Sequence, residues 1–212
     1  MKRLCCLVVC ILVFTGCGVK VVPKPTATAI LDPATNSLFW SAKGVSISVR
    51  LIDQDVASTQ MIDRVASFGV TVANQSGKEL SLPLSSYLLM DDQGNQMRPI
   101  TPEELLRIVS RDSFYLIPYP YFGYYYLEDQ AKLRSFNTMT SPLPYFPETH
   151  PQAILTEAIP TGAILHGARI SGLVYFLIDV DQVKQLEFRT YLPGSDTSTS
   201  PDFSFPFSIE KR

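Results

Sequence analysis

The sequence predicts a mainly β protein, an antiparallel β-sandwich that carries a short helical and aromatic-rich loop insertion. Several segments alternate apolar and polar side chains with a period of two, which is typical of half-buried strands. Clusters of Gly, Asn and Asp follow these segments where tight turns are expected. Strands and helices do not alternate regularly along the chain, which argues against a parallel sheet.

The first residues, MKRLCCLVVCILVFTGC, have the pattern of an export signal. Lys2 and Arg3 precede an unbroken apolar run of eleven residues, 4–14. A membrane-spanning helix needs about 20 apolar residues, so this run fits the apolar region of a signal peptide instead. The Phe-Thr-Gly-Cys stretch that ends at Cys17 resembles the lipobox of bacterial lipoproteins. The resemblance implies that residues 1–16 are removed and that Cys17 carries the lipid.

Cysteine usage is consistent with this interpretation. Three of the four cysteines lie in the leader, and none follows Cys17. We therefore expect no disulfide framework, no cysteine metal site and no cysteine nucleophile. Gly18 follows the cysteine, where an Asp would signal inner-membrane retention in many lipoproteins. The resemblance therefore implies a protein held on the outer membrane by its lipid and facing the periplasm.

We expect the mature chain to form one domain behind a tether. Residues 17–37 contain three prolines among small polar residues, which favours an extended linker. The domain itself is predicted over 38–212, with an insertion at about 99–158. Without the leader, 16 Lys and Arg stand against 20 Asp and Glu, a net charge of −4 with no basic cluster. That balance argues against nucleic acid as a partner.

The strands are predicted on both sides of the insertion. In the first half, the turns 74–77 and 91–95 separate segments with alternating or apolar patterns. In the second half, Pro206 favours an edge position for the last strand. Within the second half, Leu186, Phe188 and Tyr191 are candidates for burial, and the apolar run 173–178 fits a strand covered on both faces. The predicted strands are 45–51, 65–73, 80–84, 87–90, 173–178, 183–192 and 203–207.

The insertion begins with a helix signal. Thr101 and Glu104 fit a capping box, and Pro102 fits the first helical position, which predicts a helix over about 102–110. We expect this helix to anchor the insertion to the sandwich. A second short helix over 127–136 and an irregular, proline-rich loop over 137–152 are predicted to follow.

Two longer stretches carry a family resemblance. FGVTVANQSGKELSLPLSSYLLMDDQG (68–94) and IPTGAILHGARISGLVYF (159–176) resemble the two halves of the Ig-like, telokin-like domains of bacterial surface lipoproteins. The resemblance implies an Ig-like β-sandwich at the cell surface. It implies no reaction, because that family has no agreed activity.

The stretch FYLIPYPYFGYYY (114–126) is the most unusual feature, since eight of its thirteen residues are aromatic. Its prolines and glycine disfavour a helix or a central strand, so we expect a loop. Its rings could cover the sandwich as core, contact a protein partner, dip into the membrane interface or stack on a glycan. The candidate binding residues are Tyr119, Tyr121, Phe122, Tyr124, Tyr125 and Tyr126.

The sequence offers little for catalysis or cofactors. His150 and His166 belong to no spaced metal pattern, and no G-x-S-x-G elbow or phosphate-binding glycine loop is present. The acidic pairs 53/55, 91/92 and 179/181 fit turns at strand ends better than a Ca²⁺ loop. We therefore expect no catalytic residue, no metal and no small-molecule cofactor.

These observations favour a lipid-anchored, non-catalytic binding or assembly module that contacts an envelope protein through the aromatic stretch. Two alternatives stay open. One is a structural envelope lipoprotein whose aromatic loop is core, and the other is a glycan-binding or hydrolase accessory.

Overall fold

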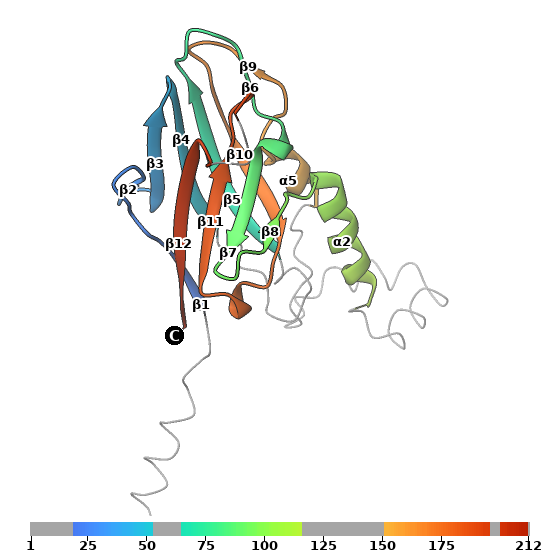
Figure 1. The fold of residues 1–212 in the computed structure, drawn as a ribbon. Helices are drawn as coiled ribbons and strands as arrows, with labels where there is room; N and C mark the ends of the chain where they lie inside the picture. The colour runs from blue at the N-terminus through green and yellow to red at the C-terminus, as the bar shows by residue number, and fades with distance from the viewer. Residues whose placement is uncertain (1–18, 53–64, 116–150, 196–199, 212) are drawn as a thin grey trace, which may run out of the picture.

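The computed structural model describes residues 19–52, 65–115, 151–195 and 200–211, which form two five-stranded antiparallel sheets packed face to face (Figure 1). The first sheet has the order β1-β12-β11-β7-β8, and the second has the order β10-β5-β4-β3-β2. The mainly β, antiparallel sandwich predicted from the sequence is thereby confirmed. The first sheet consists of β1 (Val19–Pro23), β12 (Phe203–Lys211), β11 (Gln185–Thr190), β7 (Tyr87–Asp91) and β8 (Gln96–Met97). The second consists of β10 (Arg169–Leu177), β5 (Val65–Asn74), β4 (Val45–Ile52), β3 (Ser37–Ala42) and β2 (Ile30–Asp32).

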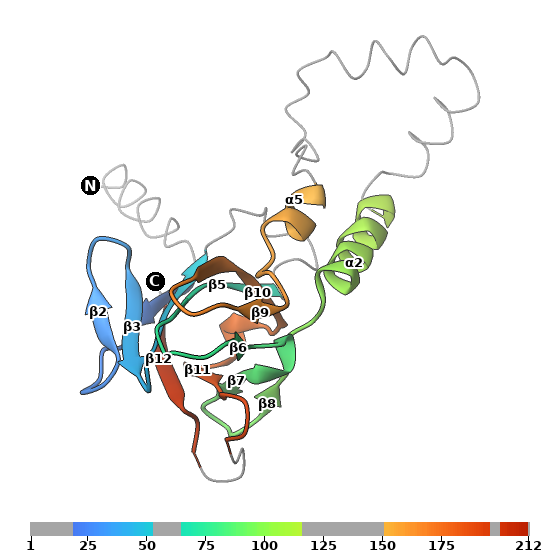
Figure 2. The same cartoon turned by 90° about the horizontal axis from the view of Figure 1, so that it is seen from above.

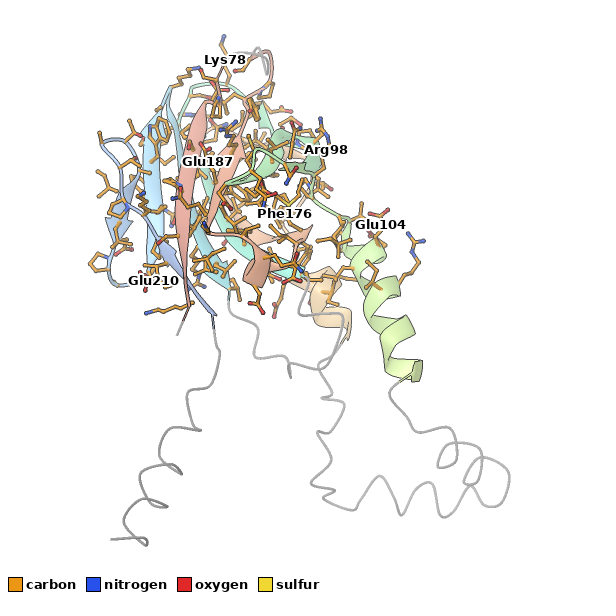
Figure 3. All side chains as sticks on the ribbon, turned by 60° about the horizontal axis from the view of Figure 1, so that its bottom comes forward. Lys78, Arg98, Glu104, Phe176, Glu187 and Glu210 are labelled. Carbon is orange, nitrogen blue, oxygen red and sulfur yellow. The ribbon has the colours of Figure 1, made fainter. Side chains whose placement is uncertain are left out.

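The core between the sheets is built from aromatic rings on alternate strand positions. Phe68 of β5 lies 5.2 Å from the ring of Phe188 on β11 and 5.5 Å from that of Phe207 on β12. Phe176 of β10 also contacts Phe188, at 5.8 Å, and its place between the sheets is visible in Figure 3. Such edge-on and tilted ring pairs stabilise a core beyond the area that they bury. A short ladder of β6 (Leu80–Ser81) and β9 (Ala163–Ile164) closes one end of the sandwich.

The insertion is fixed to the sandwich at both of its ends. It contributes α2 (Pro102–Tyr115) and α5 (Pro151–Thr156), which stand side by side at one flank (Figure 2). The capping box is present, since Thr101 N–H donates to Glu104 at 3.1 Å and Glu104 N–H donates to Thr101 at 3.2 Å. Leu105 is buried against Leu173 and Tyr175 of β10. The predicted anchoring helix is therefore observed, and it extends beyond residue 110.

The tether predicted over 17–37 is wrong for residues 19–37. Strand β1 pairs with β12 from Val19 to Pro23, and β2 pairs with β3. Pro23 and Ala29 are buried. Prolines among small polar residues favour an extended linker, but Pro23 is the last residue of a strand that pairs with β12. Residues 19–37 therefore belong to the folded domain, which was predicted to begin at residue 38.

The edge position predicted from Pro206 is also wrong, because β12 lies between β1 and β11. The carbonyl of Pro206 accepts from Lys24 N–H at 2.9 Å, on the β1 side and just past the last residue of that strand. Along a strand, the N–H and C=O groups of one residue point to the same neighbour. The missing N–H of Pro206 therefore faces a place where the ladder with β1 has already ended.

Other differences from the predicted elements are smaller. The segment 80–84 forms strand only at Leu80–Ser81 and continues as the 3-10 turn η2 (Leu84–Ser86), because Pro83 supplies no N–H. Tyr191 is half-buried, whereas Leu186 and Phe188 are buried as predicted. Residues 151–152 belong to α5 and not to an irregular loop. Leu173 to Phe176 are all buried, so the predicted strand with two covered faces is observed for these residues, but Leu177 is 43% exposed.

An ion pair links the two sheets at one end of the sandwich. Lys43, in the turn between β3 and β4, contacts Asp202, whose side chain is 4% exposed. Asp202 also accepts from Leu192 N–H at 2.8 Å. Burial alone raises the pKa of this carboxyl, but the hydrogen bonds from Lys43, Ser195 and Leu192 outweigh burial and hold the pKa below its ordinary value.

We expect Asp202→Asn to lower the free energy of unfolding by about 1–3 kcal/mol at neutral pH. Because the folded-state pKa lies below the unfolded value, this stabilisation is present above the unfolded pKa and is lost as pH falls through the folded pKa. Urea melts of both proteins at a series of pH values should show the two midpoints converging below about pH 4. A gap that stays constant down to low pH would contradict this role for the carboxylate.

Candidate functional site

The face of the second sheet that points away from the core carries hydroxyl side chains. Apolar residues of β3, β4 and β5, such as Leu38, Ile47 and Val72, point inward and are fully buried. The alternate positions point outward because successive side chains of a strand lie on opposite faces. We call this face the hydroxyl groove and define it by Ser37, Ser46, Ser48, Thr71 and Ser171.

Strand register places three of these hydroxyl groups in one line across the sheet, together with two apolar side chains. Ser48 of β4 pairs with Thr71 of β5, and Thr71 pairs with Ser171 of β10. On the other side, Ser48 pairs with Phe39 of β3, which pairs with Ile30 of β2. With about 4.8 Å between neighbouring strands, this line of five side chains extends roughly 19 Å.

Ser48, Ser37 and Thr35 form one hydrogen-bonded chain that ends on Asp32, and the other hydroxyl groups of the groove are bonded in pairs. Ser46 donates to Ser41 at 2.9 Å, Ser48 donates to Ser37 at 2.9 Å, and Thr71 and Ser171 share a bond of 2.8 Å. A hydroxyl has one donor and two acceptor lone pairs, and a pair uses one O–H and one lone pair. The chain uses the O–H groups of Ser48, Ser37 and Thr35 and leaves only acceptor lone pairs there, whereas the Thr71–Ser171 pair keeps one O–H free for a ligand.

The small side chains leave the surface hollow. Two adjoining hollows of about 450 and 480 Å³ share Thr35, Ser37, Ser48 and Thr71 in their linings. Gly69 lies on the floor of the first hollow and Ala73 on that of the second. Larger side chains border them: Arg50, Ile52 and Leu173 on one side, and Ile30, Phe39 and Arg169 on the other.

Charges of both signs border the hydroxyl groove in equal number. Arg50 and Arg169 are exposed, and within the described part of the chain neither belongs to an ion pair. Asp32 and Glu157 balance them. The Thr35 hydroxyl and the Ala34 N–H donate to Asp32, which holds the pKa of its carboxyl below the ordinary value. The groove therefore carries no net charge at neutral pH.

An apolar pair closes the β2 end of the groove. Ile30 is 62% exposed and Phe39 is 41% exposed, and the register makes them direct neighbours. Most of the other outward positions in the line are hydroxyls. A ligand in the groove would thus meet an apolar platform at one end and hydrogen-bonding groups along the rest.

The foot of the helical insertion borders the opposite end. Glu157 C=O accepts from Leu173 N–H at 2.7 Å, and Ile159 N–H donates to Leu173 C=O at 3.0 Å, so this segment follows the edge of β10. The Tyr175 hydroxyl donates to Ile154 C=O at 3.1 Å and ties α5 to the same strand. Burial, and then the charge of Glu157, raise the pKa of Tyr175 to about 12.

The outer face of the first sheet differs from the hydroxyl groove because it carries an ion pair. Glu187 accepts from Arg189 at 2.6 Å and from Ser204, so its charges are already paired. These hydrogen bonds hold the pKa of Glu187 below its ordinary value, although burial alone raises it. Glu187 lies on this face, between the ends marked by Lys78 and Glu210 (Figure 3).

The residues singled out by sequence lie mostly elsewhere. Cys17 and the six aromatic candidates Tyr119, Tyr121, Phe122, Tyr124, Tyr125 and Tyr126 lie outside the described residues, as do His150 and the pair 53/55. Phe114 and Tyr115 form the last residues of α2.

The remaining candidates have structural roles. His166 accepts from Gly77 N–H at 3.1 Å and joins two turns. Asp91 accepts from Gln93 and Asn95 within its hairpin, and Asp179 accepts from Asp181 N–H. Across the described residues, no group of three or more His, Cys, Asp or Glu is placed to hold a metal ion. In the same ranges, no helix combines the length and the apolar character needed to span a bilayer.

The hydroxyl groove was not predicted, although a signal for it was present. The polar positions of the alternating segments are mostly Ser or Thr, as in the VSISV run that begins β4. Strand alternation showed which of these residues point outward. It did not show that β3, β4, β5 and β10 are neighbours in one sheet.

The comparisons with known proteins give few likenesses. No protein-family model and no curated protein matches the chain. Among solved structures, the candidate lipoprotein ycdA of Bacillus subtilis has 13% identity and a TM-score of 0.41 over 82% of this chain. This chain spans 38% of the length of ycdA.

In two further solved structures, the matched region covers most of both chains. The yjhA protein of Bacillus subtilis has 13% identity and a TM-score of 0.40, over 79% of this chain and 93% of its own. The secreted protein MPT63 of Mycobacterium tuberculosis has 10% identity and a TM-score of 0.33, over 78% and 92%. At these scores the likenesses carry no argument about function.

Proposed function

We propose that this protein is a lipid-anchored, non-catalytic binding module of the cell envelope, and that its binding surface is the hydroxyl groove. The observation that carries the proposal is the groove itself: a hollow surface about 19 Å long across five paired strands, with an apolar pair at one end and hydroxyl groups along the rest. The export signal and the lipobox-like stretch before Gly18 support the envelope location. The outer membrane, facing the periplasm, is the address that this pattern favours.

A lipid on Cys17 would hold the domain close to the membrane. Strand β1 begins at Val19, and two residues span at most about 7 Å. The start of β1 and the end of β12 lie at the same end of the sandwich (Figure 1). That end would face the membrane, and the hydroxyl groove would lie on the side of the domain, open to the surrounding space.

Lipidation is tested by metabolic labelling with an alkyne-bearing palmitate in a bacterial host. The native chain should become labelled and partition into detergent. Cys17→Ser should lose the label, because the acceptor thiol is gone. Cys10→Ser, a change within the predicted leader, is the matched control and should stay labelled. Equal labelling of all three proteins would show that Cys17 is not the anchor.

The binding function is tested by sedimentation with insoluble cell-wall material, using the unlipidated chain from residue 17 to 212. The wild-type protein should pellet with this material. Thr71→Arg places a long side chain at the centre of the groove and should leave the protein in the supernatant. Ser208→Arg places an arginine on β12 of the first sheet and should pellet like wild type. If Thr71→Arg pellets as well as wild type, the groove is not the binding surface.

The aromatic stretch is a second candidate contact for a protein partner, and its expected binding residues remain Tyr119, Tyr121, Phe122, Tyr124, Tyr125 and Tyr126. The observation that favours it is the firm attachment of α2 and α5 to β10 at the border of the groove. An aromatic stretch that begins at the end of α2 would start from a fixed base. Aromatic side chains are enriched at protein interfaces.

A further inference from the structure

We propose that the ligand of the hydroxyl groove is an uncharged, extended glycan chain that lies across the strands. This inference rests on the proposed function, because it names the ligand class of the same surface. It is argued from the charge balance of the groove, its pattern of apolar and hydroxyl side chains, and its position on a sheet face.

The charge balance argues for a neutral ligand. Arg50 and Arg169 are matched by Asp32 and Glu157 along the same surface. An anionic polymer, such as a nucleic acid, would meet as many carboxylates as guanidinium groups, and binding of such polymers depends on an excess of Lys and Arg. Arg and Asp side chains also bind neutral hydroxyl groups, since one offers several N–H donors and the other several acceptor sites.

The order of side chains along the groove suits a chain of sugar rings. A sugar ring has apolar C–H faces and a rim of hydroxyl groups. Ile30 and Phe39 offer an exposed apolar platform for a ring face. Ser48, Thr71 and Ser171 continue the line: Ser48 offers acceptor lone pairs, and the Thr71–Ser171 pair offers acceptors and one free O–H, which match the hydroxyl groups of a sugar.

The position of the groove argues against an extended peptide. Peptides that bind to sheets add to an open edge, where the unpaired main-chain groups of the sheet are available. The hydroxyl groove lies on a face, over β3, β4, β5 and β10, whose main-chain groups are paired with one another. Its length of roughly 19 Å also requires an oligomer rather than a single sugar.

The test is calorimetric titration of the unlipidated chain, residues 17–212, with hexa-N-acetylchitohexaose and cellohexaose. At least one of these neutral oligosaccharides should bind, and its affinity should be nearly the same at about 0.05 M and 0.5 M salt, because screening affects only charge interactions. Thr71→Val should weaken binding about tenfold, since the loss of one hydrogen bond is worth about one power of ten. Phe39→Ala should weaken it at least as much, and Ser208→Ala should bind like wild type.

The inference is overturned if neither neutral oligosaccharide binds, or if Thr71→Val and Phe39→Ala bind as well as wild type. It is also overturned if oligogalacturonate or an acidic peptide binds more tightly and in a salt-dependent manner, which would make the ligand anionic. The two proposals can fail separately. The wild-type protein could pellet with cell-wall material, and Thr71→Arg could fail to pellet, while neither neutral oligosaccharide binds. That result would support the proposed binding function and rule out an uncharged glycan as its ligand.

Discussion

Replacing Gly172 with alanine is expected to lower the free energy of unfolding by about 3 kcal/mol, the upper end of the usual cost of overpacking. A Cβ atom at this position would lie 2.4 Å from Ile159 Cα, 2.5 Å from Ile159 N and 2.7 Å from Ala158 C. These atoms are backbone and cannot rotate away. They are also held by hydrogen bonds between Leu173 and both Glu157 and Ile159. Relief of the clash would therefore displace the foot of the insertion from β10.

Gly69→Ala is the matched control for this prediction. Gly69 lies on the neighbouring strand and pairs with Leu173. The three nearest atoms to a Cβ there would be side-chain atoms of Ile52 and Arg50, at 3.1 to 3.4 Å, and these side chains can move. Thermal melts should show a large drop for Gly172→Ala and a small change for Gly69→Ala. Equal melting temperatures of Gly172→Ala and wild type would show that segment 157–159 is not packed on β10.

Truncation of Phe188 to alanine is expected to cost about 3–5 kcal/mol, because it removes the ring that joins the two sheets. Phe188 is fully buried and contacts Phe68, Tyr87 and Phe176 at centroid distances of 5.2, 5.8 and 5.8 Å. At about 2–4 °C per kcal/mol for a chain of this size, the melting temperature should fall by roughly 6–20 °C. Differential scanning calorimetry measures both the temperature and the enthalpy of this transition.

Phe39→Ala is the control, since it removes a ring that is 41% exposed on the outer face of the second sheet. Its melting temperature should stay close to that of wild type. If Phe188→Ala and Phe39→Ala melted at the same temperature, the core described between the sheets would be wrong. Comparing the two variants also separates stability from binding, because Phe39→Ala is expected to impair ligand binding and to leave stability nearly unchanged.

Much of the sandwich could be predicted because its strands have clear alternation. The segment 45–51 became β4, and 65–73 became β5, with boundaries within one residue. The hairpin turn before Asn95 was correctly placed, since Gly94 has a φ of +86°, a conformation that favours glycine. Local patterns of this kind need no knowledge of the neighbouring strand.

The errors arose where a tertiary neighbour decides the structure. Residues 19–23 have no strong pattern of their own, and they become β1 because the free edge of β12 pairs with them. Pro206 was assigned to an edge by the general rule, yet its missing N–H faces the place where β1 ends, so the interior position is tolerated. Neither partner could be known from the local sequence.

The hydroxyl groove was missed for the same reason. Ser48, Thr71 and Ser171 lie far apart in the sequence, and only the register of β4, β5 and β10 brings them into line. Each serine or threonine alone is an ordinary polar position of a half-buried strand. The aromatic stretch attracted the prediction of a binding site because it is contiguous, whereas the groove is assembled from four strands.

The central claim, that the hydroxyl groove binds an uncharged glycan, is tested most directly by NMR titration of the ¹⁵N-labelled chain, residues 17–212, with hexa-N-acetylchitohexaose and with cellohexaose. For at least one of them, we expect the largest amide shift changes at the outward residues of β4, β5 and β10, above all Ser48, Thr71 and Ser171, with the amides of β11 and β12 unchanged. Shift changes confined to the first sheet, or no change with either oligosaccharide, would contradict the claim.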